Sequence, residues 1–297
     1  MNTELNNNRI GFCCILLGNN PSKFRSTTVT WCSKNLNTYE QKLREITKSN
    51  LSELTRVIDY CINRRIWLYR ISSDLIPLPD HPLGIETWLD SPVALAEEWQ
   101  LAKEKVAEYL LLGGRLTVHP SQYVSISSPK DNVRQNSINN LEYHGLLFDR
   151  LGLPRTHFAL INIHVSNGKL GNLSVDTVRD SIARLSDSVV SRLTFENEDK
   201  SFWTAENLST YFRTPIVFDT LHYSCNSGDI SFDSAFEYAR QSWESFAPKV
   251  RQLCHHSEGI TGPNDRRHSD FVKEIPALGC DIEVEAKMKN LAIEKFL

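Results

Sequence analysis

The chain has 297 residues, a formal net charge of −3, 40% hydrophobic residues and 23% charged residues. These values fit an ordinary globular protein with a sizeable core. They give no overall basic signature, so nucleic-acid binding would depend on a local patch or on bound cations. The seven cysteines include no C-x-x-C pair, which favours reduced thiols in an intracellular protein over a disulfide framework or a zinc ribbon.

The beginning of the chain, "MNTELNNN", is polar, and no segment of signal-peptide type follows it. No apolar run approaches the ~20 residues that span a bilayer. We therefore expect an intracellular protein, in the cytoplasm, at the nucleoid or in a nucleus, with no membrane partner. Residues 1–8 are predicted to form a flexible N-terminus.

Eight short segments, most of them rich in β-branched or aromatic residues, are predicted to be buried parallel strands. In chain order they are 9–17, 66–73, 115–120, 158–166, 192–199, 215–224, 250–258 and 280–287.

Segments with helical periodicity separate these strands. The first runs over 39–65 with a break at Ser49–Asn50, and the second begins at a Ser91–Pro92 cap and ends at Gly113–Gly114. The other predicted helices are 131–152, 174–190, 231–246, a short one near 203–212, and a turn or two after the seventh strand.

Eight strand–helix units predict a single (β/α)8 TIM barrel that occupies residues 1–297. The alternative is an open, doubly wound sheet. Its nucleotide-binding form is poorly supported, because no G-x-G-x-x-G or Walker loop follows the first strand.

In a TIM barrel the chemistry is found at the carboxyl ends of the strands. Nearly every predicted strand of this chain ends in a residue type that binds metals, and one more such residue lies in the loop after the seventh strand. These residues are His119, His164, Glu196, Asp219, His222, His255, His268 and Glu285. Each could instead be structural, as a hydrogen-bonded core histidine or a capping carboxylate. Together they favour a multinuclear metal site.

Imidazole and carboxylate ligands together suit Zn or Mn, with Fe as a further choice, whereas Mg prefers oxygen. A carboxylate such as Glu196 can bridge two metals ~4 Å apart, an arrangement that assists phosphoryl displacement. The residue chemistry therefore leaves two reactions open, metal-assisted phosphoester hydrolysis and metal-dependent sugar isomerisation.

The last predicted strand places Asp281, Glu283, Glu285 and Lys287 on one face. Three carboxylates that face a barrel interior would repel one another unless they are protonated or balanced by cations.

Eight ordered motifs resemble those of the UV damage endonuclease family, a xylose-isomerase-like TIM barrel. They are "RISSDLIPLPDHP", "HPSQYV", "IHVSNG", "FENED", "VFDTLHY", "HHSEG", "RRHSD" and "DIEVEAK". The resemblance implies a manganese-dependent DNA repair endonuclease that nicks duplex DNA immediately 5′ of ultraviolet photoproducts, leaving 3′-hydroxyl and 5′-phosphate ends. More distantly, the chain is similar to abasic-site endonucleases and sugar isomerases of the same barrel superfamily, which remain the alternative functions.

The resemblance also implies a ligand set for up to three ions. His119 and His164 would hold one ion with Glu196 as a bridge, and His222 and His268 would hold the third. The second ion would be held by the four residues expected to be catalytic, Glu196, Asp219, His255 and Glu285. Mn2+ is the expected metal, with Zn2+, Mg2+ or Co2+ as alternatives.

The same resemblance implies the DNA contacts. Gln122 and Tyr123 would enter the duplex and fill the gap that two flipped damaged bases leave. His81 would lie beside the damage pocket. Independently of the resemblance, we expect backbone phosphates to meet Lys169, Arg266, Arg267, Lys287 and Arg134, with solvated surface as the alternative for each. The protein is expected to act as a monomer on UV-damaged double-stranded DNA.

Two positions depart from the family pattern. Leu253 replaces a lysine, often carboxylated, that the family has two residues before the strand-seven histidine, and leucine cannot bind a metal. Phe12 stands where the family often has a tyrosine, so a hydroxyl group is missing at a position that we expect to lie beside the DNA.

Overall fold

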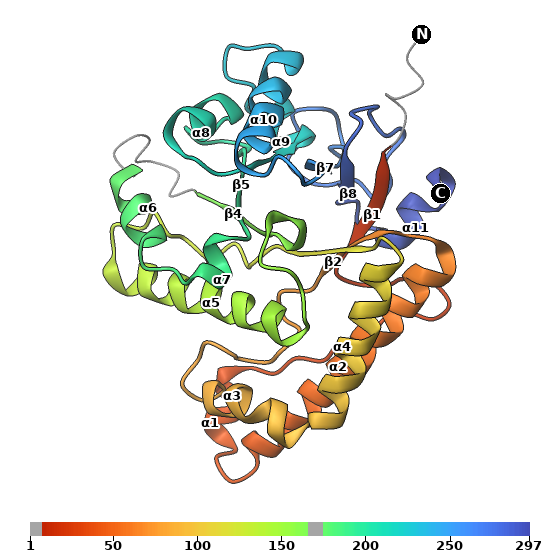
Figure 1. Cartoon of the computed structure of the whole chain (residues 1–297), viewed down its shortest axis with the longest axis vertical. Helices are drawn as coiled ribbons and strands as arrows, with labels where there is room; N and C mark the ends of the chain where they lie inside the picture. Colours follow the sequence, from red (N-terminus) through yellow and green to blue (C-terminus); the bar gives the residue numbers. More distant parts are fainter. Residues whose placement is uncertain (1–7, 166–174) are drawn as a thin grey trace.

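Eight short parallel strands close into a barrel in which each strand lies beside its sequence neighbour and β8 pairs with β1. This computed structural model describes residues 8–165 and 175–297. The closed order confirms the predicted (β/α)8 barrel (Figure 1). The strands are β1 (Arg9–Cys13), β2 (Leu68–Ile71), β3 (Arg115–Val118), β4 (Ile161–His164), β5 (Leu193–Glu196), β6 (Ile216–Asp219), β7 (Leu253–His256) and β8 (Asp281–Val284).

Helices of unequal length surround the strands. They are α1 (Val29–Lys34), α2 (Tyr39–Arg64), α3 (Ile85–Ala94), α4 (Ala96–Leu111), α5 (Asp131–Arg150), α6 (Val175–Ile182), α7 (Asp187–Val190), α8 (Ala205–Tyr211), α9 (Thr220–Cys225), α10 (Phe232–Phe246) and α11 (Lys289–Ile293), with short 3-10 turns at His157–Ala159 and Glu294–Phe296. Two of the longer helices, α2 and α4, lie side by side in Figure 1.

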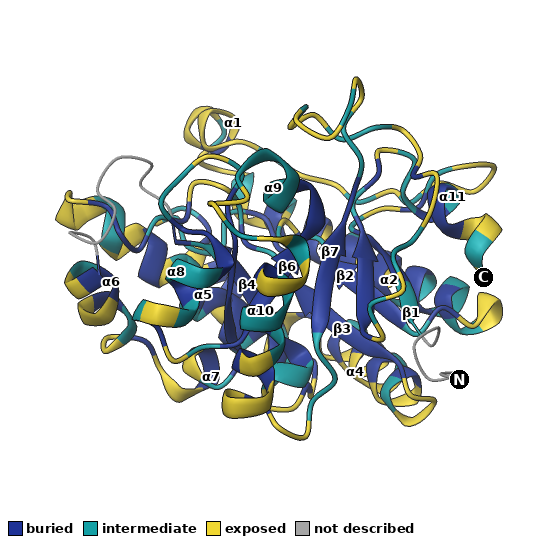
Figure 2. Cartoon of the chain, turned by 90° about the horizontal axis from the view of Figure 1, so that it is seen from above, coloured by how far each residue is buried: buried dark blue, intermediate teal, exposed yellow. Residues whose placement is uncertain are grey.

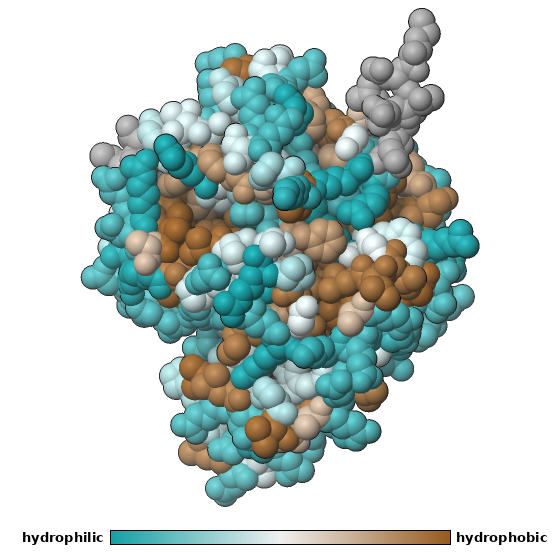
Figure 3. Space-filling view, in the orientation of Figure 1, coloured by the Kyte–Doolittle hydropathy of each residue, from teal (hydrophilic) through white to brown (hydrophobic). Residues whose placement is uncertain are grey.

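The strands are buried and the helices are amphipathic. Figure 2 shows the strands in dark blue at the centre, and exposed residues mainly on the outer helices and loops. The space-filling view of Figure 3 shows hydrophilic residues over most of the visible face, with apolar patches between them. The apolar sides of the helices therefore mostly face the barrel.

The predicted break at Ser49–Asn50 is wrong, because α2 runs without interruption through both residues. The Asn50 side chain is fully buried. It accepts a hydrogen bond from the Arg25 N–H (2.8 Å) and donates to the carbonyls of Arg25 (2.9 Å) and Leu75 (2.9 Å). Asparagine is therefore used here to hold two loops on the helix and not to end it.

The predicted Ser91–Pro92 cap is also wrong, because Pro92 lies inside α3 and the next helix begins at Ala96. Proline cannot donate to the Trp88 carbonyl four residues earlier. The Ser91 hydroxyl and the Arg150 guanidinium donate to that carbonyl instead, each at 2.8 Å. The proline is tolerated because both substitutes are present.

Two further boundaries differ from the prediction. The segment 174–190 holds two helices, and between them Glu142 accepts hydrogen bonds from the Ser186 N–H and hydroxyl, both at 2.6 Å. The sixth strand stops at Asp219, whose carboxylate accepts from the His222 N–H at 2.6 Å and so caps α9. After β7, residues 257–280 contain no helix, only a bridge between Gly259 and His268.

The N-terminal end of the barrel interior is closed by charge pairs. Asp281 is fully buried, and its carboxylate contacts Arg9 (2.6 Å), Arg115 (2.9 Å) and Arg251 (3.0 Å). One of the three inward-facing carboxylates predicted for the last strand is thus balanced by arginines. In the described part of the chain, no helix has the length and apolar character needed to cross a membrane.

Candidate metal centre

The carboxyl ends of the strands bring five of the predicted ligands to one rim. His164, Glu196 and Asp219 are the last residues of β4, β5 and β6, and His255 belongs to β7. The register pairs His164 with Glu196 and Asp219 with His255. His119 follows β3 by one residue. Because all strands are parallel, their ends converge on the same opening.

The first group consists of His119, His164 and Glu196, whose ligand atoms lie within 4.8 Å of one another. His119 Nε2 is 3.2 Å from Glu196 Oε2, and the two imidazole rings are 5.0 Å apart between centroids. The Nδ1–H of His119 donates to the Pro120 carbonyl (2.9 Å). The Nε2 lone pair of His119 is therefore directed toward Glu196.

The second group shares Glu196 and adds Asp219 and His255, all three buried, with ligand atoms again within 4.8 Å. His255 Nδ1 lies 3.1 Å from Glu196 Oε2 and 3.3 Å from Glu285 Oε1. Glu285 thus belongs to the same cluster. Glu196 is the common member of both groups.

His222 and His268 stand at the edge of this cluster. His222 Nδ1 is 3.1 Å from Glu196 Oε1 and donates to the Asn197 carbonyl at 2.9 Å. His268 Nδ1 donates to the Glu285 backbone carbonyl at 2.8 Å. Among residues 8–165 and 175–297, only the two groups above bring three ligand atoms so close. The predicted pairing of His222 with His268 therefore has no group of its own, and it stays a prediction.

Burial and neighbouring charges shift the pKa values of the clustered side chains. Burial would raise the pKa of Glu196, but His255 and His164 hold it well below its usual range. Burial raises the pKa of Asp219. The carboxylates of Asp219 and Glu196 overcome burial and raise the pKa of His222 well above its usual value, and those of Glu196 and Glu285 do the same for His255. Burial lowers the pKa of His164 to about 4.

Two buried atoms in the cluster have no hydrogen-bond partner among the described residues, Asp219 Oδ2 and His255 Nδ1. Both belong to the second group. Buried polar atoms are normally satisfied, and a divalent cation would satisfy a carboxylate oxygen and an imidazole lone pair together. The mixed oxygen and nitrogen donors are those that Mn and Zn accept. The residues therefore fit a bound metal.

Two polar residues of the site, Arg70 and Asn162, were not predicted as site residues. Arg70 of β2 pairs with Glu285 and lies 3.5 Å from Glu283 Oε2. Asn162 of β4 donates to Glu196. The alternation of inward and outward side chains places Arg70 and Asn162 inside the barrel, and this pattern could have identified them.

The candidate DNA-contacting residues differ in their exposure to solvent. Gln122 and Tyr123 lie on the loop after β3, and Tyr123 is 82% exposed. Phe12 is fully buried against Tyr69 and Tyr60 on the outer side of β1. Its expected place beside the DNA is therefore wrong, because Gly11 and Cys13 hold the inward positions of that strand.

The cationic candidates are mostly paired. Arg266 contacts Asp199 (3.1 Å) and Arg267 contacts Asp265 (2.8 Å), although both side chains are at least half exposed. Arg134 is tied to Asp131 and the Ser128 carbonyl. Lys287 is exposed, His81 accepts from the Leu83 N–H within its own turn, and Lys169 lies outside the described residues.

Leu253, which replaces the family lysine, is fully buried below His255. It packs with Leu68, Leu160 and Val217 in an apolar layer inside the barrel. A side chain of this kind adds no charge to the cluster.

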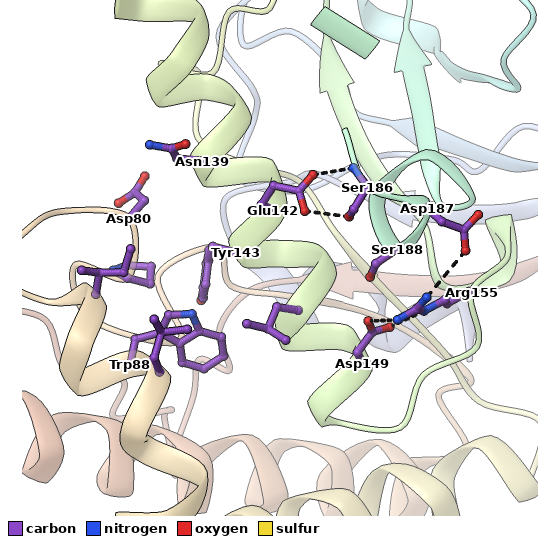
Figure 4. Close-up of a pocket in the computed structure, with 14 residues that line it drawn as sticks. Asp80, Trp88, Asn139, Glu142, Tyr143, Asp149, Arg155, Ser186, Asp187 and Ser188 are labelled. Atoms are coloured by element: carbon purple, nitrogen blue, oxygen red, sulfur yellow. Dashed lines mark hydrogen bonds and ion pairs between the residues drawn. The ribbon is translucent and has the colours of Figure 1, made fainter. Parts of the chain in front are cut away.

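A groove of about 610 Å³ lies on the outer side of the barrel between α3 and α5, with Trp88 and Tyr143 in its lining (Figure 4). Arg155 bridges Asp149 and Asp187 at its edge. None of the clustered histidines and carboxylates lines this groove. It is therefore separate from the candidate metal centre.

Comparison with known proteins places these features in a family. The family model described as "UV-endonuclease UvdE" matches residues 8–297. A UV DNA damage endonuclease of Nostoc sp. is 35% identical over 296 residues, covering 96% of this chain and 88% of that protein. One from Deinococcus radiodurans is 32% identical over 293 residues, covering 96% and 93%. The crystal structure of SacUVDE shares the fold, with a TM-score of 0.81 at 24% identity, over 96% of this chain and 95% of that one.

Proposed function

Because the chain belongs to the UV-endonuclease UvdE family, we propose that it hydrolyses the phosphodiester bond immediately 5′ of ultraviolet photoproducts in double-stranded DNA. Cyclobutane dimers and 6-4 photoproducts are the proposed lesions, and 3′-hydroxyl and 5′-phosphate ends are the proposed products. The observation that carries this proposal is the pair of ligand groups that share the buried Glu196.

We propose Mn2+ as the metal, in two or three copies. His119 and His164 would hold one ion with Glu196, and Asp219, His255 and Glu285 would hold another with Glu196. Divalent ions in such a site polarise a phosphoryl oxygen and lower the pKa of bound water.

The protein side chains supply position and charge. Glu196, placed between two histidines of one group and two members of the other, sets the distance between the two halves of the site. The Nδ1–H groups of His119, His222 and His268 are each held by a backbone carbonyl, which fixes the orientation of the three rings. The scissile phosphate would be received by a preorganised site, which is how phosphoryl transfer is mainly assisted.

Damage recognition is assigned to the loop after His119. The exposed Tyr123 ring can replace stacking that is lost when damaged bases leave the helix, and the Gln122 amide can satisfy base edges. Poorly paired bases cost least to extrude. Cations at the rim would also offset the negative charge of the chain where DNA approaches.

The test is an incision assay on three otherwise identical duplexes, with one thymine dimer, one abasic site or no lesion, in the presence of Mn2+. The proposal predicts one nick directly 5′ of the dimer and an intact undamaged duplex. Glu196→Gln should abolish the nick, whereas Glu142→Gln, a carboxylate change in the outer groove, should leave it unchanged.

Equal cutting of damaged and undamaged duplexes would overturn the proposal. Cleavage of the abasic duplex only would select an abasic-site endonuclease. If no DNA is cut with any divalent metal while ketoses are converted, the chain would be a sugar isomerase.

A further inference from the structure

Behind the candidate ligands, β8 carries a carboxylate that no step of the proposed reaction uses. Glu283 is fully buried. The Thr117 hydroxyl donates to its Oε1, and Arg70 Nη1 lies 3.5 Å from its Oε2. The carboxylate is therefore held from two sides, by β3 and by β2.

The remaining contact of Glu283 is with the ring of His255. His255 Nε2 lies 3.2 Å from Glu283 Oε2, while Nδ1 on the opposite side of the ring faces Glu196 and Glu285 at 3.1 and 3.3 Å. The imidazole thus stands between the candidate metal position and Glu283.

Three other histidines of the cluster are oriented differently from His255. In His119, His222 and His268, the nitrogen that carries the proton, Nδ1, donates to a backbone carbonyl. His255 is turned the other way, and its outer nitrogen faces a side-chain carboxylate. Leu253, the inward residue before His255 on the same strand, offers no polar atom.

A histidine that binds a metal through Nδ1 must carry its proton on Nε2. Arg70 Nη1 is also 3.4 Å from Nε2, and it could donate only to the opposite tautomer. Glu283 Oε2 decides between them, because it is buried and, apart from the ion pair with Arg70 at 3.5 Å, has no hydrogen-bond partner among the described residues. A proton on Nε2 gives this oxygen its missing partner.

We propose that Glu283, held by Thr117 and Arg70, is a positioning residue that fixes His255 with Nε2 protonated and Nδ1 directed at the metal. This inference rests on the proposed function, since it assigns a role toward the metal of that site. Outer carboxylates that orient a metal-binding histidine typically contribute 10- to 100-fold in metal affinity.

The experiment compares Glu283→Gln and Glu283→Leu with the wild type, and Asp281→Asn is the matched control. Asp281 is a fully buried carboxylate on the same strand and face, but it contacts arginines at the other end of the barrel. Calorimetric titration with Mn2+ should show a dissociation constant raised about 10- to 100-fold in Glu283→Leu, a smaller rise in Glu283→Gln, and no change in Asp281→Asn.

A second readout separates positioning from general loss of structure. In the Zn2+-loaded protein, long-range 1H–15N NMR of the imidazoles should show His255 with its proton on Nε2 in the wild type. Glu283→Gln, which keeps the side-chain shape, should show a mixture of tautomers or loss of the Nε2–H signal.

The possible results distinguish a failure of this inference from a failure of the proposed function. Wild-type affinity and tautomer in both Glu283 variants would overturn the inference while leaving the proposed function intact. Equal weakening by Asp281→Asn and Glu283→Gln would make Glu283 merely structural. A wild-type protein that binds no Mn2+ would defeat the proposed function, and this inference with it.

Discussion

Tyr123 is an aromatic ring that a folded protein has no internal reason to expose. It is 82% exposed, whereas the next residue, Val124, is buried and anchors the loop. Stacking of an aromatic side chain on nucleic-acid bases contributes ~1–3 kcal/mol per base. A ring held in solvent by a fixed loop is suited to that use.

We therefore predict that Gln122→Ala with Tyr123→Ala reduces the preference for a dimer-containing duplex by about 10-fold or more. Binding to damaged and undamaged duplexes, measured by fluorescence anisotropy, checks this. Metal content should stay at the wild-type value, because neither residue is in the ligand groups. A variant that loses its metal would show that the pair is structural.

His144 on α5 gives a prediction for pH. It is buried, and burial lowers its pKa to about 4 from an ordinary value of 6.5. As the pH falls, the unfolded chain binds the proton first, so the stabilisation that is complete above pH ~6.5 is lost toward pH ~4.

Between pH 7.5 and pH 5 this histidine should cost the metal-free protein about 2 kcal/mol of unfolding free energy. Urea unfolding at both values should show a smaller loss for His144→Gln than for the wild type. Equal losses would mean that His144 does not titrate as its burial requires.

At the level of single residues, the sequence predicted which side chains meet but not what balances them. His119, His164, Glu196 and Asp219 were predicted because parallel strands end at one rim. The sequence also predicted that the carboxylates of the last strand are either protonated or balanced by cations. Alternation along β2 places Arg70 inside the barrel, but its pairing with Glu285 and its contact with His255 could not be predicted, because these residues lie 215 and 185 positions away in the sequence.

Among the elements, α2 shows how tertiary contacts override local preference. Ser49–Asn50 is a weak point for a helix, yet three hydrogen bonds from Asn50 tie it to Arg25 and Leu75. The eight predicted strand segments are confirmed, because alternating side chains and β-branched residues indicate strands from local sequence alone. The boundaries failed where a side chain from another element satisfied the backbone, as Arg150 does for Trp88.

Asn50→Ala should accordingly destabilise the protein by about 3 kcal/mol, because it removes three hydrogen bonds and leaves the buried Leu75 carbonyl and the partly buried N–H and carbonyl of Arg25 without this partner. Ser52→Ala, an exposed change on the same helix, should stay within about 0.5 kcal/mol of the wild type. Chemical denaturation of both variants measures the difference. Similar values for the two would show that Asn50 is not an anchor.

At the scale of the whole molecule, charged side chains are buried at both ends of the barrel interior. At one end Asp281 is balanced by arginines, and at the other Glu196, Asp219 and Glu285 meet histidines and Arg70. A ligand that binds only the folded chain stabilises it by mass action, by about 2.7 kcal/mol at a concentration 100 times its dissociation constant.

Mn2+ at such a concentration should raise the unfolding free energy by that amount, and EDTA should reverse the gain. Asp219→Asn combined with His255→Gln should show a smaller response to Mn2+, because these residues hold the two unsatisfied atoms of the second ligand group, whereas His119, His164 and Glu196 are unchanged. An equal response in this variant would locate the metal elsewhere.

Anomalous diffraction at the manganese edge, from crystals grown with saturating Mn2+, addresses the metal centre most directly. We predict density peaks between His119, His164 and Glu196 and between Glu196, Asp219, His255 and Glu285, with Glu196 in contact with both. Side chains that point apart, with no anomalous peak among them, would contradict the account.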